Sequence, residues 1–249
     1  MLSIIAFTSI PSLGSKHGKA LRVLDLNYLV VKITGKAFDA GSTLIKKYVS
    51  VLRSLLDSYR AIVITGGGST ARKYMDIARD IGVKSNYWLD SIGIWTSRLN
   101  SLLLISALSE YAYPRPPENL EEALRAVGCH KLVVMGGLMA GQSTASVLLQ
   151  VAEALEVKRV YYFSAVGRVY DKDPAKYPDA KPFSVITASE LKSILEQSNL
   201  PGEYALIDSK ALDIALRSAI QIQLLDYKDP HQIEAALQGS NPGTIIIPK

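Results

Sequence analysis

Short apolar runs rich in valine and isoleucine alternate with longer amphipathic segments along most of the chain. The runs lie at residues 29–33, 61–65, 131–135, 159–164, 220–225 and 244–247. Near-continuous apolar runs of four to six residues are typical of strands that are buried on both faces. The pattern therefore predicts six buried strands.

The segments between these runs have the spacing of helices. From Leu44 to Leu56 apolar residues recur every three or four positions, and Ser42 is predicted to cap this helix. Similar patterns predict helices at 69–81, 88–110, 143–155, 187–196, 208–218 and 230–237. Strands that alternate with helices predict an α/β fold with three α/β/α layers and a mainly parallel central sheet. Ligands of such a sheet are expected at the carboxyl ends of its strands.

The first convincing strand begins near Tyr28, so residues 1–27 are interpreted as an N-terminal extension. Pro11, Gly14 and Gly18 mark loop within it. The extension is either an added strand or the product of a misassigned start, and the residues do not distinguish these alternatives.

Composition and charge narrow the class of protein. The chain has 249 residues, 48% apolar and 20% charged, which is enough to bury a large core. Its formal net charge of +5 suits a polyanionic small ligand as well as nucleic acid. No run of five basic residues occurs and the 13 tyrosines are scattered, so we do not expect nucleic acid as a partner.

A single cysteine, Cys129, excludes an internal disulfide and a cysteine-based zinc site. It is expected to be a small buried residue. No stretch approaches the ~20 apolar residues that a membrane span requires. We therefore expect a cytoplasmic protein without a membrane partner.

Glycines follow the first two predicted strands. Lys32-Ile33-Thr34-Gly35-Lys36 could place an ammonium and backbone N–H groups against phosphate oxygens, although a surface lysine beside an ordinary turn explains the same residues. Three glycines in the segment 65–72 (TGGGSTAR) stand between a strand and a helix start, which favours phosphate binding over a structural turn.

The second segment also satisfies the dinucleotide pattern G-x-G-x-x-A. The acidic residue that this pattern needs should end a second strand, whereas Asp90 lies in the predicted helix. The match to a dinucleotide fold is therefore poor.

The two later loops carry further polar groups. Segment 136–144 nearly fits the P-loop pattern, but Gln142 replaces its lysine, which excludes a P-loop NTPase and leaves a loop suited to a monophosphate or a base edge. In the segment 164–174, an exposed aromatic beside a carboxylate could stack on and orient a base, and a plain hairpin is equally compatible.

Five segments together resemble the archaeal UMP kinases of the amino-acid-kinase family, in order and in spacing. They are KITGK from residue 32, TGGGSTAR from 65, LDSIGIWTSRLN from 89, MGGLMAGQST from 135 and VYDKDP from 169. The resemblance extends from about Leu29 to Pro248. It implies a carbamate-kinase-like fold with an acceptor-nucleotide lobe at about 28–155 and an ATP-binding lobe at about 156–249.

The resemblance also implies an activity and its residues. The family transfers the γ-phosphoryl group of ATP to UMP in pyrimidine nucleotide biosynthesis, needs Mg²⁺ and forms homo-hexamers. Lys32 would stabilise the transferring phosphoryl group, and no side chain is expected to bind a metal. ATP would contact Gly35, Lys36, Gly68, Arg72, Ser164, Tyr170 and Asp173. UMP would contact Gly67, Asp90, Leu138, Met139, Ala140, Gly141, Gln142, Ser143 and Thr144.

The fourth loop departs from the family pattern. Where these kinases usually read TNVDGVY, this chain reads SAVGRVY from residue 164. An amide is lost at Ala165, a carboxylate is lost at Gly167, and Arg168 stands where glycine is usual. We expect an active UMP kinase, in which Arg168 could supply a compensating cation to the phosphates. The alternative is a nucleotide-binding relative with reduced or no kinase activity.

Overall fold

The computed structural model describes residues 27–172, 174, 176–197 and 207–249. Apart from Asn27, the predicted extension at 1–27 lies outside the described residues. The ATP-side candidate Asp173 also lies outside them.

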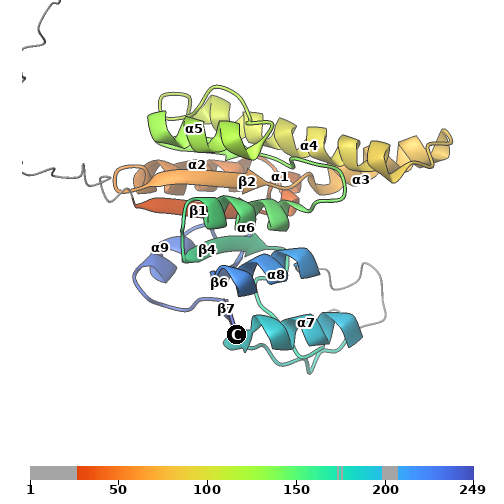
Figure 1. Cartoon of the computed structure of the whole chain (residues 1–249), viewed down its shortest axis with the longest axis vertical. Helices are drawn as coiled ribbons and strands as arrows, with labels where there is room; N and C mark the ends of the chain where they lie inside the picture. The colour runs from red at the N-terminus through yellow and green to blue at the C-terminus, as the bar shows by residue number, and fades with distance from the viewer. Residues whose placement is uncertain (1–26, 173, 175, 198–206) are drawn as a thin grey trace, which may run out of the picture.

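A seven-stranded sheet forms the centre of the molecule (Figure 1). Its strands are β1 (Tyr28–Ile33), β2 (Arg60–Thr65), β3 (Leu132–Met135), β4 (Arg159–Ser164), β5 (Val185–Thr187), β6 (Gln221–Asp226) and β7 (Thr244–Ile247). Their order is β3-β2-β1-β4-β6-β7-β5, and every described pair is parallel except β6 with β7. The mainly parallel sheet is confirmed, and the six expected strands agree within one residue at each end.

Helices cover both faces of this sheet because alternate side chains of each strand point to opposite sides. Val30 and Ile62 pack in a cluster with α5 (Leu120–Cys129), α6 (Thr144–Ala154), α7 (Ala188–Gln197) and α8 (Ser209–Arg217). Val31 and Val63 pack in a second cluster with α2 (Ser42–Leu55), α4 (Asn86–Ala107) and α9 (Gln232–Leu237). The three-layer fold is therefore confirmed.

Two helices that begin directly after strands complete the part of the fold that matters for function. Helix α1 (Gly35–Asp39) follows β1 directly, and α3 (Gly68–Asp80) follows β2. Helix α3 packs along α4, and the two extend beyond the sheet on the right of Figure 1. Within the described residues, no helix is both long enough and apolar enough to cross a membrane.

Three local predictions were incomplete or wrong. Helices α1 and α5 and strand β5 were not predicted. Ser42 is the first residue of α2 rather than its cap, since Gly41 occupies the cap position with a φ of +89°. Cys129 is exposed, contrary to expectation, because it ends α5 beyond Val127, the last buried residue of that helix.

Candidate active site

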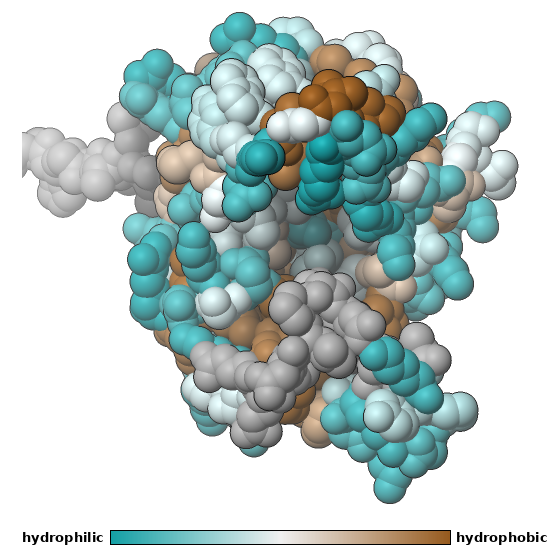
Figure 2. Space-filling view, turned by 90° about the vertical axis from the view of Figure 1, so that its right-hand side faces the viewer, coloured by the Kyte–Doolittle hydropathy of each residue, from teal (hydrophilic) through white to brown (hydrophobic). Residues whose placement is uncertain are grey.

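The loops that follow β1, β2, β3 and β4 lie along one edge of the sheet, because these strands are parallel neighbours. Ile33 is in register with Thr65 on one side and with Phe163 on the other. Thr34 N–H donates to Phe163 O over 3.0 Å, and Gly66 N–H donates to Ile33 O over 3.0 Å. The surface at this edge is hollowed below the part of the molecule that carries α3 and α4 (Figure 2). The sequence predicted this convergence.

The first two glycine loops touch each other through their backbones. A Cβ atom built on Gly35 would lie 1.9 Å from Gly68 N, and one built on Gly66 would lie 2.7 Å from Gly35 N. Gly68 has a φ of +69°, which disfavours any residue with a side chain. Only glycine fits Gly35 and Gly68 in this arrangement, so bare backbone from two strand ends meets at one place.

Lys32 is buried beneath these loops. Its side chain is 4% exposed, and its Nζ lies 3.9 Å from the centre of the Tyr162 ring on β4. Lys32 is therefore not the surface lysine that the simpler interpretation required. No carboxylate of the described residues pairs with its ammonium, so a phosphate anion would supply the charge compensation that this buried group needs.

Two further predicted cations, Lys36 and Arg72, are exposed on α1 and α3. Neither forms an ion pair with a described residue. Gly67, predicted at UMP, precedes α3, and a Cβ atom built there would lie 3.3 Å from Gly93 O on α4. The loop after β2, which contains Gly66, Gly67 and Gly68 and which we call the glycine loop, is thus packed between α1 and α4.

The segment 136–144 after β3, which holds most of the residues predicted to contact UMP, is joined to α4. Asp90 Oδ2 accepts a hydrogen bond from Gly141 N–H over 2.7 Å. Ser143 caps α6 by accepting from Ala145 N–H over 3.1 Å and from Ser146 N–H over 3.0 Å. We call residues 136–144 the acceptor loop, after the prediction that they bind the nucleotide that accepts the phosphoryl group.

Other members of the acceptor loop have different surroundings. Leu138 packs against the core, whereas Met139 is exposed. Ala140 and Thr144 are half-buried. The Gln142 amide donates to Gln150 Oε1 on α6 over 2.6 Å, so this side chain points along α6.

Polar side chains of α4 hold the glycine loop and the acceptor loop together. Asn100 Nδ2 donates to Gly66 O over 2.7 Å, and Gly137 N–H donates to Ser97 Oγ over 2.8 Å. Thr65 Oγ1 donates to Ser97 O over 2.8 Å and lies 2.7 Å from Ser101 Oγ. All of these groups are buried, where hydrogen bonds are costly to break.

The fourth loop forms a tight turn followed by a hairpin. Gly167 N–H donates to Ser164 Oγ over 2.9 Å, and Gly167 has a φ of +73°, so the glycine at this unusual position suits the turn. Tyr170 pairs with Pro182 in an antiparallel bridge and is half-buried. Arg168 donates to Pro242 O over 3.0 Å, which directs its guanidinium towards the start of β7.

Sequence reasoning missed two carboxylates at this edge. Asp39 of α1 accepts hydrogen bonds from Ser69 N–H over 2.9 Å and from Ser69 Oγ over 2.7 Å, and so satisfies the first turn of α3. Asp208 caps α8 and contacts Ser143 of the acceptor loop. Neither belongs to a glycine motif, and each meets a residue at least 30 positions away in the sequence.

Comparison with known proteins identifies relatives of this chain. A sequence profile of the amino acid kinase family matches residues 27–226. A uridylate kinase from Staphylothermus marinus is 57% identical over 89% of this chain and 99% of its own length. One from Pyrobaculum arsenaticum is 44% identical over 88% of this chain and 98% of its own.

Solved structures agree with these sequences. The crystal structure of uridylate kinase from Archaeoglobus fulgidus has a TM-score of 0.79 at 28% identity and covers 89% of this chain and all of that one. The UMP kinase of Bacillus anthracis, at 18% identity and a TM-score of 0.73 over 90% of this chain and 96% of its own, shares the fold. The chain therefore belongs to the amino acid kinase family, within its uridylate kinase branch.

Proposed function

We propose that the protein transfers the γ-phosphoryl group of ATP to UMP, giving UDP and ADP, as a step of pyrimidine nucleotide biosynthesis. The observation that carries this proposal is the buried Lys32 ammonium, which has no carboxylate partner among the described residues and lies at the end of β1. Phosphoryl transfer needs little covalent chemistry from the protein, and fixed cations and backbone N–H groups aimed at the spreading charge provide most of the catalysis.

The two nucleotides would bind at the carboxyl ends of the strands, where the loops that carry their predicted contacts lie. UMP would contact Gly67, Asp90 and the acceptor loop, and the Asp90–Gly141 hydrogen bond supports this by fixing that loop against α4. ATP would contact Gly35, Lys36, Gly68, Arg72, Ser164 and Tyr170. The close packing of Gly35 on Gly68 supports the phosphate end of this site, because neither residue carries a side chain that would keep a phosphate away from the backbone.

Mg²⁺ would enter with ATP. Among the described residues, no group of three or more histidine, cysteine or acidic side chains is placed to hold a metal ion. Mg²⁺ usually binds through substrate phosphates and water with one or two carboxylates rather than in a protein cage. Bound there, it would neutralise charge that develops between the β- and γ-phosphates.

The first experiment measures ADP release from the purified protein with ATP and Mg²⁺. UMP, CMP, aspartate and carbamate are compared as acceptors, because related members of this fold phosphorylate such compounds. UMP should support turnover, and Lys32→Met should reduce kcat by ~100- to 1000-fold, the usual effect of removing one group that stabilises developing charge. Equal turnover of Lys32→Met and the wild type would contradict the proposal.

A stability measurement separates lost catalysis from lost folding. Lys32 is buried without a carboxylate partner among the described residues, so its charge is costly to keep in the folded state. Lys32→Met should therefore have a urea midpoint at least as high as that of the wild type. A variant that is inactive because it unfolds would show the opposite.

The protein would also act as a homo-oligomer, with six subunits by its resemblance to the family. The described residues include 13 exposed large hydrophobic side chains, and nine of them lie on α3, at its end or on α4. They are Tyr74, Ile77, Ile81, Tyr87, Trp88, Trp95, Leu99, Leu102 and Leu103. A grouped apolar surface of this kind marks an interaction site.

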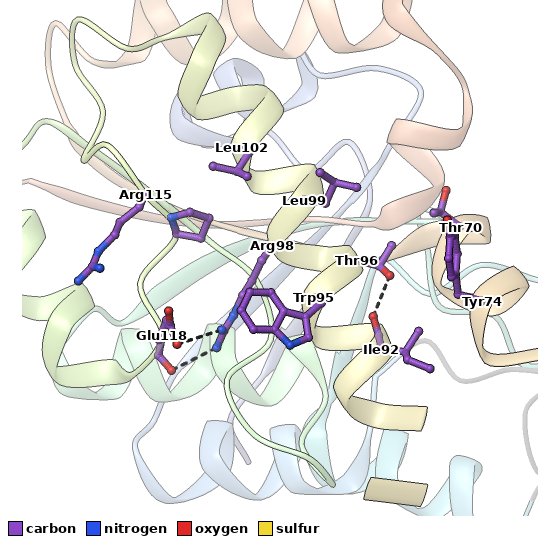
Figure 3. Close-up of a pocket in the computed structure, with 11 residues that line it drawn as sticks. Thr70, Tyr74, Ile92, Trp95, Thr96, Arg98, Leu99, Leu102, Arg115 and Glu118 are labelled. Carbon is purple, nitrogen blue, oxygen red and sulfur yellow. Dashed lines mark hydrogen bonds and ion pairs between the residues drawn. The ribbon is translucent and has the colours of Figure 1, made fainter. Parts of the chain in front are cut away.

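A pocket of about 560 Å³ lies within this surface. Figure 3 shows Trp95 beside Arg98, whose guanidinium points towards Glu118, with Leu99 and Leu102 along the same helix. Leu99→Glu should place a charge in the subunit contact and reduce the mass measured by light scattering. Tyr177→Glu, at an aromatic that is similarly exposed outside this surface, is the control. An unchanged mass for Leu99→Glu would contradict association through α3 and α4.

A further inference from the structure

The first turn of α8 is bonded to the acceptor loop and to the helix that follows it. Asp208 Oδ2 accepts a hydrogen bond from Ser143 Oγ, and its Oδ1 accepts from Ser146 Oγ over 2.9 Å. Lys210 Nζ donates to Gly141 O over 3.1 Å. Three bonds thus connect residues 208–210 with residues 141–146, although about 60 positions separate them in the sequence.

Asp208 has a second task that fixes its own position. Its Oδ1 also accepts from Ala211 N–H over 3.1 Å, which caps α8. The carboxylate is therefore held by its own helix while both of its oxygens accept from α6 and the acceptor loop. Hydrogen bonds to a charged acceptor are stronger than neutral ones, so this carboxylate orients the Ser143 side chain firmly.

Gly141 is held from two sides. Its N–H donates to Asp90 of α4, and its carbonyl accepts from Lys210 of α8. Gly141 has a φ of +76° and no neighbouring atom that a Cβ would contact, so packing does not fix it. These two side chains therefore determine where the exposed tip of the acceptor loop lies.

We propose that Asp208 and Lys210 are positioning residues for the acceptor nucleotide. They hold the acceptor loop in the geometry that binds UMP and so attach it to α8, which lies in the part of the chain assigned to ATP. This inference rests on the proposed function. Neither residue needs to touch a reacting atom, because each acts through Ser143 or Gly141.

The test separates the Michaelis constants of the two substrates. Asp208→Asn keeps a capping side chain on α8 but removes the charge and one acceptor oxygen. It should raise KM for UMP by about tenfold, the effect of losing one charge-assisted hydrogen bond, and change KM for ATP by less than about twofold. Lys210→Met should act in the same direction, and Lys210→Arg should restore most of the affinity.

Ser146→Ala tests the network without touching the acceptor loop. It removes one donor to Asp208 and should raise KM for UMP by about twofold to threefold. Because the two residues share one bond, the double variant with Asp208→Asn should be less impaired than the product of the single effects.

Arg217→Gln is the matched control at the far end of α8. Arg217 binds Glu153 of α6 through two hydrogen bonds, so the variant loosens α8 from α6 away from the acceptor loop. A KM for UMP that stays within about twofold for Arg217→Gln and rises for Asp208→Asn supports the positioning role. An equal rise in both variants, or none in Asp208→Asn, overturns it.

Calorimetric titration of UMP distinguishes a failure of the positioning role from a failure of the proposed function. Wild-type protein that binds and phosphorylates UMP while Asp208→Asn behaves identically refutes only the positioning role. Wild-type protein that neither binds UMP nor releases ADP refutes the proposed function and the inference with it.

Discussion

Gly35→Ala tests whether the contact between the two glycine loops sets the geometry of the site. The added Cβ would lie 1.9 Å from Gly68 N and 2.4 Å from Gly68 Cα. Both atoms belong to backbone, so no flexible side chain can move aside. The loop after β1 or the loop after β2 must shift instead.

The size of the shift follows from ordinary contact distances. Carbon and nitrogen atoms that are not bonded keep more than about 3 Å apart, so the two loops must separate by about 1 Å. Inserting one methyl group into a well-packed place costs ~1–3 kcal/mol of stability. A displacement of ~1 Å in groups that position a substrate costs ~100-fold in rate, which we expect for kcat/KM here.

The assay combines ADP release with urea unfolding. Gly128→Ala is the control, since this helical glycine has open space where its Cβ would lie. It should leave activity unchanged and raise stability by ~0.5–1 kcal/mol, because alanine loses less backbone entropy in a helix. A kcat/KM for Gly35→Ala within threefold of the wild type would refute the argument that these loops need bare backbone.

Three further predictions concern other parts of the structure. Asp39→Ala leaves the first turn of α3 without its acceptor and should lower the unfolding free energy by ~1 kcal/mol in urea titrations, whereas Asp39→Asn should lower it less. Hydrogen bonds from Arg217 and Ser218 lower the pKa of Glu153 below its ordinary value of 4.5. The stability that Glu153 adds is therefore present above about pH 4.5 and lost as the pH falls towards the lowered pKa, so Glu153→Gln should show a shallower loss of urea midpoint in that range. Exposed Cys129 should react with a thiol reagent in the folded protein without loss of ADP release; an unreactive thiol would contradict its exposure.

Most of the fold was predictable because buried parallel strands and amphipathic helices leave long, regular patterns. β5 has three residues and, within the described part of the chain, pairs with β7 alone, so it has no period to detect. α5 carried a signal that went unused: Asn119 accepts from Glu122 N–H at its start, and Ala123, Ala126 and Val127 form its buried face.

The candidate site was predictable from the residues themselves where a glycine motif followed a strand. Lys32 and the glycine loops were found because parallel strands bring their carboxyl ends to one edge. Asp39 and Asp208 were not, because their roles depend on bonds between distant segments. The burial of Lys32 was also beyond the sequence, since it depends on how closely the loops after β1 and β2 pack.

Helix α4 is bonded to both the glycine loop and the acceptor loop and so fixes their relative positions. Apolar packing has no direction, so a 22-residue helix held by it alone would tolerate rotation or a slide by one turn. The bonds of Asn100 to Gly66 and of Ser97 to Gly137 allow one register only. The distance between the glycine loop and the acceptor loop is therefore fixed by α4.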